Sequence, residues 1–132
     1  MTLRPFAVSG WLLIAIAFAV SCGSGNNGQR QMLSLDLGPA IANPAPGANV
    51  QFTATGHFDM PPSSDKVTPL SWFESTQDAL HVGNGIAAVD QSGLAHCNAT
   101  GTTWVTAEAL SGVLNRFGDP ALVRGTAQMN CP

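Results

Sequence analysis

The chain is short of charge, and of positive charge above all. Only 10% of its 132 residues are charged, and five basic residues against eight acidic ones give a formal net charge of −3. Soluble globular domains average about 25% charged residues. Proteins that bind nucleic acids neutralise phosphates with a basic patch or stripe, and this sequence has none. We therefore expect no nucleic-acid partner.

The sequence also lacks the patterns of common catalytic centres. It contains no Gly-x-Ser-x-Gly elbow, which would mark a serine nucleophile. The spacing of Glu74, Asp78 and Glu108 does not place two carboxylates across a cleft, as glycoside hydrolysis requires. We expect no enzymatic activity and no cofactor.

Metal ligands are equally sparse. Zinc sites show closely spaced histidines and cysteines, and four such ligands in all. Of the possible ligands here, only His57 and Asp59 would share one face of a strand, while His81 and His96 stand apart. Exposed polar side chains are the better interpretation, and we predict no metal site.

The N-terminus, by contrast, is strongly apolar. A short basic start precedes the almost wholly apolar run from Phe6 to Val20, and the small residues Ala19 and Ser21 lie three and one positions before Cys22. This order predicts a secretory signal peptide over residues 1–21. A membrane-spanning helix needs about 20 apolar residues, more than this run provides. An uncleaved membrane anchor is the alternative.

Cys22 lies in the segment Ala19-Val-Ser-Cys22-Gly23, which resembles a bacterial lipoprotein cleavage site, although Leu is usual where Ala19 stands. The resemblance implies a lipid on the Cys22 thiol, which would anchor the chain to a membrane of the cell envelope. In a host with two membranes, Gly23 in place of Asp resembles the signal for sorting to the outer membrane. We expect the domain at the outer membrane or cell surface, facing the periplasm or the exterior. Ordinary cleavage leaving an unmodified Cys22 is the alternative. Residues 22–30 would then be a flexible tether, spanning about 16 Å as a random coil.

Of the three cysteines, one lies at the predicted cleavage site and two lie in the globular part. An odd cysteine is awkward in an exported protein, but Cys22 is already assigned to the lipid. Cys97 and Cys131 remain, and an oxidising compartment favours a disulfide between them. Free buried thiols are the alternative.

Residues 31–132 alternate between apolar and polar with the period of strands, and no window of about 11 residues has helical spacing. Leu33, Leu35 and Leu37 fall on one face of the first strand. Loops are expected at 57–68 and 110–122. Strands are expected at 32–37, 50–55, 70–75, 86–90, 94–97, 102–109 and 122–131. About seven short strands predict an all-β antiparallel sandwich, with a small barrel as the alternative.

Four segments resemble the group 2 bacterial immunoglobulin-like domain, in order and with similar spacing over about residues 32–130. They are Val50-Gln-Phe-Thr-Ala-Thr-Gly56, Val67-Thr-Pro-Leu-Ser-Trp72, Ile86-Ala-Ala-Val-Asp-Gln-Ser-Gly-Leu94 and Gly101-Thr-Thr-Trp-Val-Thr-Ala107. The resemblance implies an immunoglobulin-like sandwich with a spacer or adhesion role. Such domains usually occur in tandem, whereas one copy occurs here. We expect the core to contain Phe52, Trp72 and Val89.

Trp104 alternates with Val105 in a strand, so one of the two points away from the core. An outward Trp104 could stack on a sugar ring, whereas a shift of one residue would bury it. The sequence thus indicates a lipid-anchored interaction or adhesion module of the cell envelope. Its contacts with an unknown protein would involve a sheet edge or the two expected loops. Binding of a surface carbohydrate is the alternative.

The intact mass of the chain extracted from its native membrane tests the lipid and the disulfide together. We expect a chain that begins at Cys22, carries acyl groups, and gains one hydrogen on each of Cys97 and Cys131 upon reduction. An unmodified Cys22 would indicate a soluble exported domain, and a retained Met1 would indicate a membrane span.

Overall fold

The computed structural model describes residues 28–76 and 82–132, and the secondary structure in these ranges consists of strands without a helix. Ten strands are found there, which confirms the all-β prediction. Their bounds are β1 Met32–Gly38, β2 Ile41–Ala42, β3 Asn49–Gln51, β4 Thr53–Phe58, β5 Ser64–Val67, β6 Ser71–Ser75, β7 Ala87–Val89, β8 Leu94–Cys97, β9 Gly101–Leu114 and β10 Pro120–Cys131.

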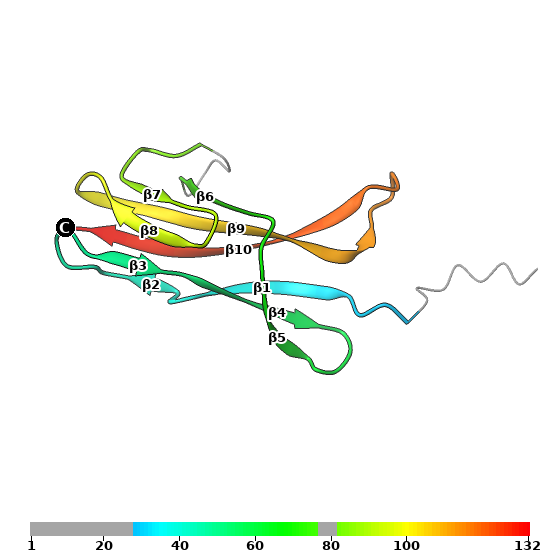
Figure 1. The fold of residues 1–132 in the computed structure, drawn as a ribbon. Helices are drawn as coiled ribbons and strands as arrows, with labels where there is room; N and C mark the ends of the chain where they lie inside the picture. Colours follow the sequence, from blue (N-terminus) through cyan, green and yellow to red (C-terminus); the bar gives the residue numbers. More distant parts are fainter. Residues whose placement is uncertain (1–27, 77–81) are drawn as a thin grey trace, which may run out of the picture.

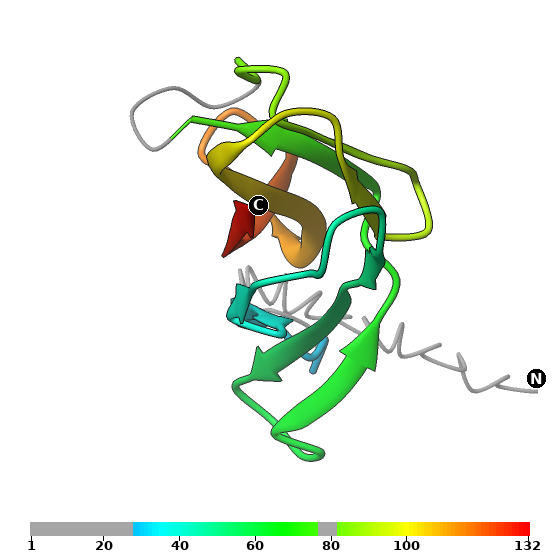
Figure 2. The same ribbon diagram turned by 90° about the vertical axis from the view of Figure 1, so that its left-hand side faces the viewer.

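The strands form two layers (Figures 1 and 2). The first is a sheet in the order β2-β10-β9-β6, in which only the short pairing of β2 with β10 is parallel. In the second, β3 and β4 are two halves of one extended segment interrupted at Phe52, whose N–H donates to the carbonyl of Gly93. β4 pairs with β1 and β5, and β3 pairs with β8, which pairs with β7.

This strand order is that of an immunoglobulin-like sandwich. Such domains have one sheet in which the first, second, fifth and fourth strands are neighbours, and another formed by the third, sixth and seventh. Here β1, β3/β4, β8 and β7 correspond to the first set, and β6, β9 and β10 to the second. β5 has no counterpart in that scheme. It follows the second strand in the sequence, precedes the third, and pairs with β4.

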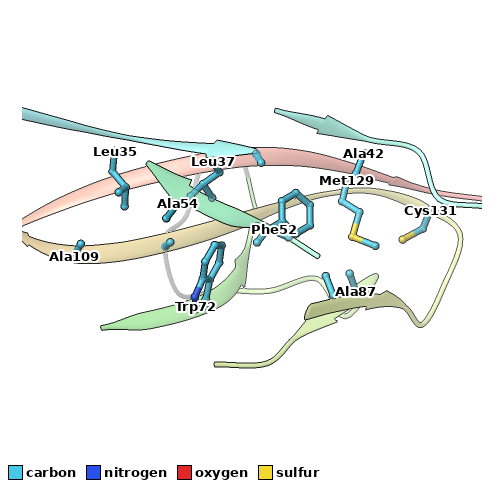
Figure 3. Close-up of a cluster of buried hydrophobic side chains, with 14 of the residues drawn as sticks. Leu35, Leu37, Ala42, Phe52, Ala54, Trp72, Ala87, Ala109, Met129 and Cys131 are labelled. Atoms are coloured by element: carbon cyan, nitrogen blue, oxygen red, sulfur yellow. The ribbon is translucent and has the colours of Figure 1, made fainter. Parts of the chain in front are cut away.

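The core lies between the two layers (Figure 3). Phe52 and Trp72 are buried at its centre, with exposed fractions of 1% and 5%, as predicted. Val89 is half-buried and packs against the core from its margin. Full burial of each large apolar side chain stabilises the fold by about 1.5–3 kcal/mol. Small side chains fill much of the rest, namely Ala42, Ala54, Ala87, Ala95, Ala107, Ala109 and Ala127.

Both predicted loops were partly wrong, because each contains a hairpin. In the first, β4 continues to Phe58 and β5 returns, although Ser64, Asp65 and Lys66 of β5 are exposed and give no alternating pattern. In the second, β9 continues to Leu114 and β10 begins at Pro120. In β5 only Val67 packs against the core, so β5 lacks the alternation of buried and exposed residues by which a strand is recognised in a sequence.

The expected face of the first strand was also partly wrong. Leu35 and Leu37 are buried, but Leu33 is 60% exposed. The pairing of β1 with β4 shifts register between Met32 and Ser34. A bulge of this kind breaks the alternation of side chains between the two faces. As a result Leu33 points to solvent, and Met32 is buried in the core in its place.

The disulfide between Cys97 and Cys131 is present, with a Cα–Cα distance of 5.6 Å. The register of β9 and β10 places Cys131 opposite Gly101, close to the end of β8. The two cysteines are 34 residues apart in the sequence. Closing a ring of that size stabilises the fold by roughly 3–4 kcal/mol in the chain-entropy model.

The turn between β7 and β8 is fixed by one carboxylate. Asp90 accepts hydrogen bonds from the hydroxyl of Ser92 at 2.6 Å, from its N–H at 2.8 Å, and from the N–H of Leu94 at 3.0 Å. The Ser92 hydroxyl is the main cause that lowers the pKa of Asp90 below its usual value. Gly93 ends this turn with a φ of +81°, against the Phe52 carbonyl and the Trp72 ring.

Two glycine substitutions should separate the strain of positive φ from close packing. Gly118 has a φ of +85° with open space around it, whereas a Cβ at Gly93 would lie 2.7 Å from the Phe52 oxygen. We expect Gly118→Ala to lower the free energy of unfolding by about 1–2 kcal/mol, and Gly93→Ala by a further ~1–3 kcal/mol of overpacking. Urea unfolding measures both, and equal losses would contradict the close approach.

Candidate binding surfaces

One edge of the four-stranded sheet is largely open among the described residues. β10 pairs with β9 along its length, but its other edge pairs only with β2, at Gln128 and Met129. The N–H of Gln128 points to that side, because it donates to the carbonyl of Ala40. Backbone direction alternates along a regular strand, so the N–H and C=O groups of Thr126 and Arg124 face the same side. We call residues 124–126 the open β10 edge.

The open β10 edge borders a hollow of about 500 Å³ between β10 and β1, lined by Leu35, Asp36, Leu37, Ala40, Arg124, Gly125 and Thr126. Gly125 allows the two layers to approach closely here, because a Cβ on it would lie 2.4 Å from the Leu35 carbonyl oxygen. The side chains of Leu35 and Leu37 are buried in the core, whereas Asp36, Arg124 and Thr126 are exposed beside the hollow. A hollow next to a strand edge suits an extended peptide.

The charged side chain beside the open edge is held in place. Arg124 lies opposite Glu108 in the β9–β10 ladder, and its Nε donates to the Glu108 carboxylate at 2.5 Å. The hydroxyl of Ser71 donates to the other carboxylate oxygen at 3.3 Å. The Glu108 side chain is only 10% exposed, whereas that of Arg124 is 45% exposed. The guanidinium therefore stands at the rim with one side still facing solvent.

Trp104 lies on the outer face of the sheet. Its cross-strand neighbours are Ser75 on β6 and Gln128 on β10. Directly opposite residues of an antiparallel pair share a face, and Val105 is fully buried on the inner one. Trp104 is half-buried, so the structure favours the outward orientation that the sequence left open.

The surroundings of Trp104 are polar. The hydroxyls of Ser75 and Thr106 lie 2.8 Å apart. The amide of Gln128 donates to the Asn130 side-chain oxygen at 2.7 Å, and the Asn130 amide donates to Asn43 at 2.7 Å. The Ser75 and Thr106 hydroxyls are buried and bonded to each other, so the polar groups beside the indole that a sugar could reach are the side chains of Gln128 and Asn130.

The possible metal ligands are not brought together. His57 contacts Asp36 at 2.8 Å, and Asp59 accepts the N–H of Gln31. His96 lies opposite Asn49, at the far end of the β3–β4 segment from His57. His81 lies outside the described residues. Within 28–76 and 82–132, no three His, Cys, Asp or Glu residues form a group suited to a metal.

The acidic residues do not face one cleft either. Glu74 lies on the inner face opposite Val105 and accepts hydrogen bonds from the N–H groups of Gly85 and Ala87, which ties the segment before β7 to β6. Glu108 lies on the outer face opposite Ser71. Asp78 lies outside the described residues. The two carboxylates that can be placed are thus separated by the sheet.

The β9–β10 hairpin extends beyond the packed layers at the end of the molecule opposite the C-terminus (Figure 1). We call residues 110–122 the hairpin tip. It carries four exposed apolar side chains, namely Leu110, Leu114, Phe117 and Leu122. The sequence predicts a contact surface here, but as a loop rather than as a paired hairpin.

Cys22, the predicted site of lipid attachment, lies outside the described residues. In the described ranges, no helix has the length and apolarity to cross a membrane. The chain matches no known protein-family model, and no curated protein matches it significantly. Its resemblance to group 2 bacterial immunoglobulin-like domains therefore stays a prediction from the sequence.

The sequence predicts contact through a sheet edge, but it does not indicate that this edge belongs to β10. The alternation of Val123, Gly125 and Ala127 predicts the strand correctly, yet an edge strand and a central strand with this pattern look alike. Only the strands that pair with β10 decide which of its backbone N–H and C=O groups have no partner strand. The closest sequence signal for an uncovered edge is the pair Pro39 and Pro44. These prolines keep β2 short, so that it covers little of β10.

Proposed function

We propose that the chain is a lipid-anchored, non-catalytic interaction module of the cell envelope. An immunoglobulin-like domain, related to the group 2 bacterial family, is held at a membrane by a lipid on Cys22 and recognises a partner protein. The partner adds an extended strand to the open β10 edge.

The observation that carries this proposal is the row of outward backbone groups at Arg124 and Thr126, next to the hollow between β10 and β1. An unpaired strand edge is a template for another strand, whose main-chain hydrogen bonds supply affinity. Side chains of the added strand would reach the hollow at alternate positions. Nothing in this mode requires a nucleophile, a metal or a cofactor.

Thr126→Pro should block strand addition and leave the fold intact. Proline removes the N–H that faces the open edge, while the bonds to β9 come from Gly125 and Ala127. With a photo-crosslinker at Ala40 in intact cells, we expect a specific partner to be captured by the unmodified chain and lost with Thr126→Pro.

Thr126→Ala is the matched control, because it removes the side chain but keeps the N–H. It should retain the crosslinked partner, and a crosslinker at the exposed Ser92 should capture much less of it. A retained Cys97–Cys131 disulfide and an unchanged β-sheet circular dichroism spectrum exclude misfolding of the proline variant. Equal capture with Thr126→Pro and Thr126→Ala would rule out pairing at this edge.

Carbohydrate binding is the second candidate function, favoured by the outward position of Trp104 among polar side chains. We expect Trp104→Ala to weaken retention on cell-surface polysaccharide by about tenfold, which corresponds to ~1.4 kcal/mol. Trp104→Phe retains an aromatic face and should lose less. Affinity electrophoresis measures the retention, and no effect of Trp104→Ala would dispose of this candidate.

A further inference from the structure

The hairpin tip concentrates exposed apolar surface at one end of the molecule. Of the eight large apolar side chains that are exposed in the described ranges, four lie between residues 110 and 122. Phe117 is the most exposed of all at 73%, and Leu114 follows at 66%. Single exposed apolar residues are ordinary, but a cluster on a projecting hairpin indicates a contact.

The turn that presents these residues is well formed. The side-chain oxygen of Asn115 accepts the N–H groups of Phe117 at 2.8 Å and Asp119 at 3.0 Å. The N–H of Asn115 donates to the carbonyl of Asp119 at 2.7 Å, which closes the loop. The Arg116 guanidinium lies over the Phe117 ring, 4.6 Å from its centroid. The tip is therefore a defined structure whose apolar side chains are held in solvent.

The chain enters the domain at the base of this hairpin. A Cβ on Gly112 would lie 2.9 Å from the carbonyl oxygen of Arg30. Arg30 is held in turn by the Phe58 ring, 3.5 Å from its centroid, and by Asp65 at 3.4 Å. The disulfide and the C-terminus lie at the opposite end of the sandwich (Figure 1).

The lengths of the tether and of the hairpin match. From Gly112 to Phe117 the chain can extend by at most about 16 Å, at ~3.3 Å a residue. The predicted tether, residues 22–30, would have a root-mean-square span of about 16 Å if it were a random coil. A membrane that holds Cys22 is therefore within reach of the tip without stretching of the tether. Such a tether would also keep the tip at a high effective concentration near that surface.

We propose that the hairpin tip inserts shallowly into the bilayer to which Cys22 anchors the chain, with Leu114 and Phe117 as the inserted side chains. This inference rests on the proposed lipid anchor. The charges of Arg116 and Asp119 cancel at the tip, so apolar burial drives the contact and anionic lipids add little. The insertion fixes the orientation of the domain, with the hairpin toward the membrane and the disulfide end away from it.

Depth-dependent fluorescence quenching tests the insertion directly. The full chain purified from membranes, with Phe117→Trp, is reconstituted into phosphatidylcholine vesicles containing lipids brominated at known acyl positions. After subtraction of the unmodified chain's emission, we expect the added tryptophan to lose more than half of its emission. The loss should change little when phosphatidylglycerol is added. Ile41→Trp is the matched control, because Ile41 is 58% exposed on β2, near the disulfide end, and should not be quenched.

Two outcomes would overturn the proposal. Equal quenching of Phe117→Trp and Ile41→Trp would mean that the tip does not enter the bilayer. A blue-shifted Phe117→Trp emission that bromine does not quench, and that increases with protein density, would mean that a second copy covers the tip.

A Cys22→Ser variant separates this inference from the proposed anchor. If Cys22→Ser releases the chain from cell membranes while Phe117→Trp is not quenched, the anchor stands and the insertion fails. If the intact mass shows no acyl group on Cys22, the anchor fails, and the quenching of Phe117→Trp on vesicles still decides whether the tip inserts.

Discussion

The register of the β9–β10 ladder is the constraint on which the rest of the structure depends. Its pairing runs from Gly101 opposite Cys131 to Leu114 opposite Pro120. At one end it brings Cys131 to Cys97, and in the middle it directs Val105, Ala107 and Ala127 into the core. A slip of one residue would exchange the two faces and expose this inner row. The same register therefore sets the core, the disulfide and the outward position of Trp104.

The core is thin because many of its side chains are small. Alanines occupy facing positions of both layers, and Gly125 lets β1 cross β10 at backbone distance. Phe52 and Trp72 are its two buried aromatic side chains, and Gly93 fits between the Phe52 carbonyl and the Trp72 ring because it has no Cβ. Such a sandwich has little tolerance for added volume. It gains stability from the disulfide, which joins the end of β8 to the end of β10.

The candidate contact surfaces occupy different parts of this framework. The open β10 edge lies on one side, Trp104 on the outer face, and the hairpin tip at the end of the sandwich where Arg30 approaches Gly112. If the tip faces the membrane, the strand edges stand upright and remain accessible to a partner. The three surfaces can thus act together without competing for the same residues.

The sequence by itself determined the features that depend on local pattern. Alternation at Val50–Thr55 and Thr102–Ala109 predicted strands, the large rings of Phe52 and Trp72 predicted the core, and the pairing of Cys97 with Cys131 followed from the count of cysteines. The N-terminal segment gave an expectation about export and anchoring that rests on residues before the described ranges.

Only the tertiary structure decided what depends on partners far apart in the chain. Alternation has the same form on edge and central strands, so the pairing of β10 alone left Arg124 and Thr126 open. The bulge after Met32 exposed Leu33, and exposed hairpin arms such as β5 carry no apolar period to detect. Burial of one face of a strand requires alternating apolar and polar residues, which a sequence displays. A backbone group without a partner strand requires no particular residue, so the sequence does not display it.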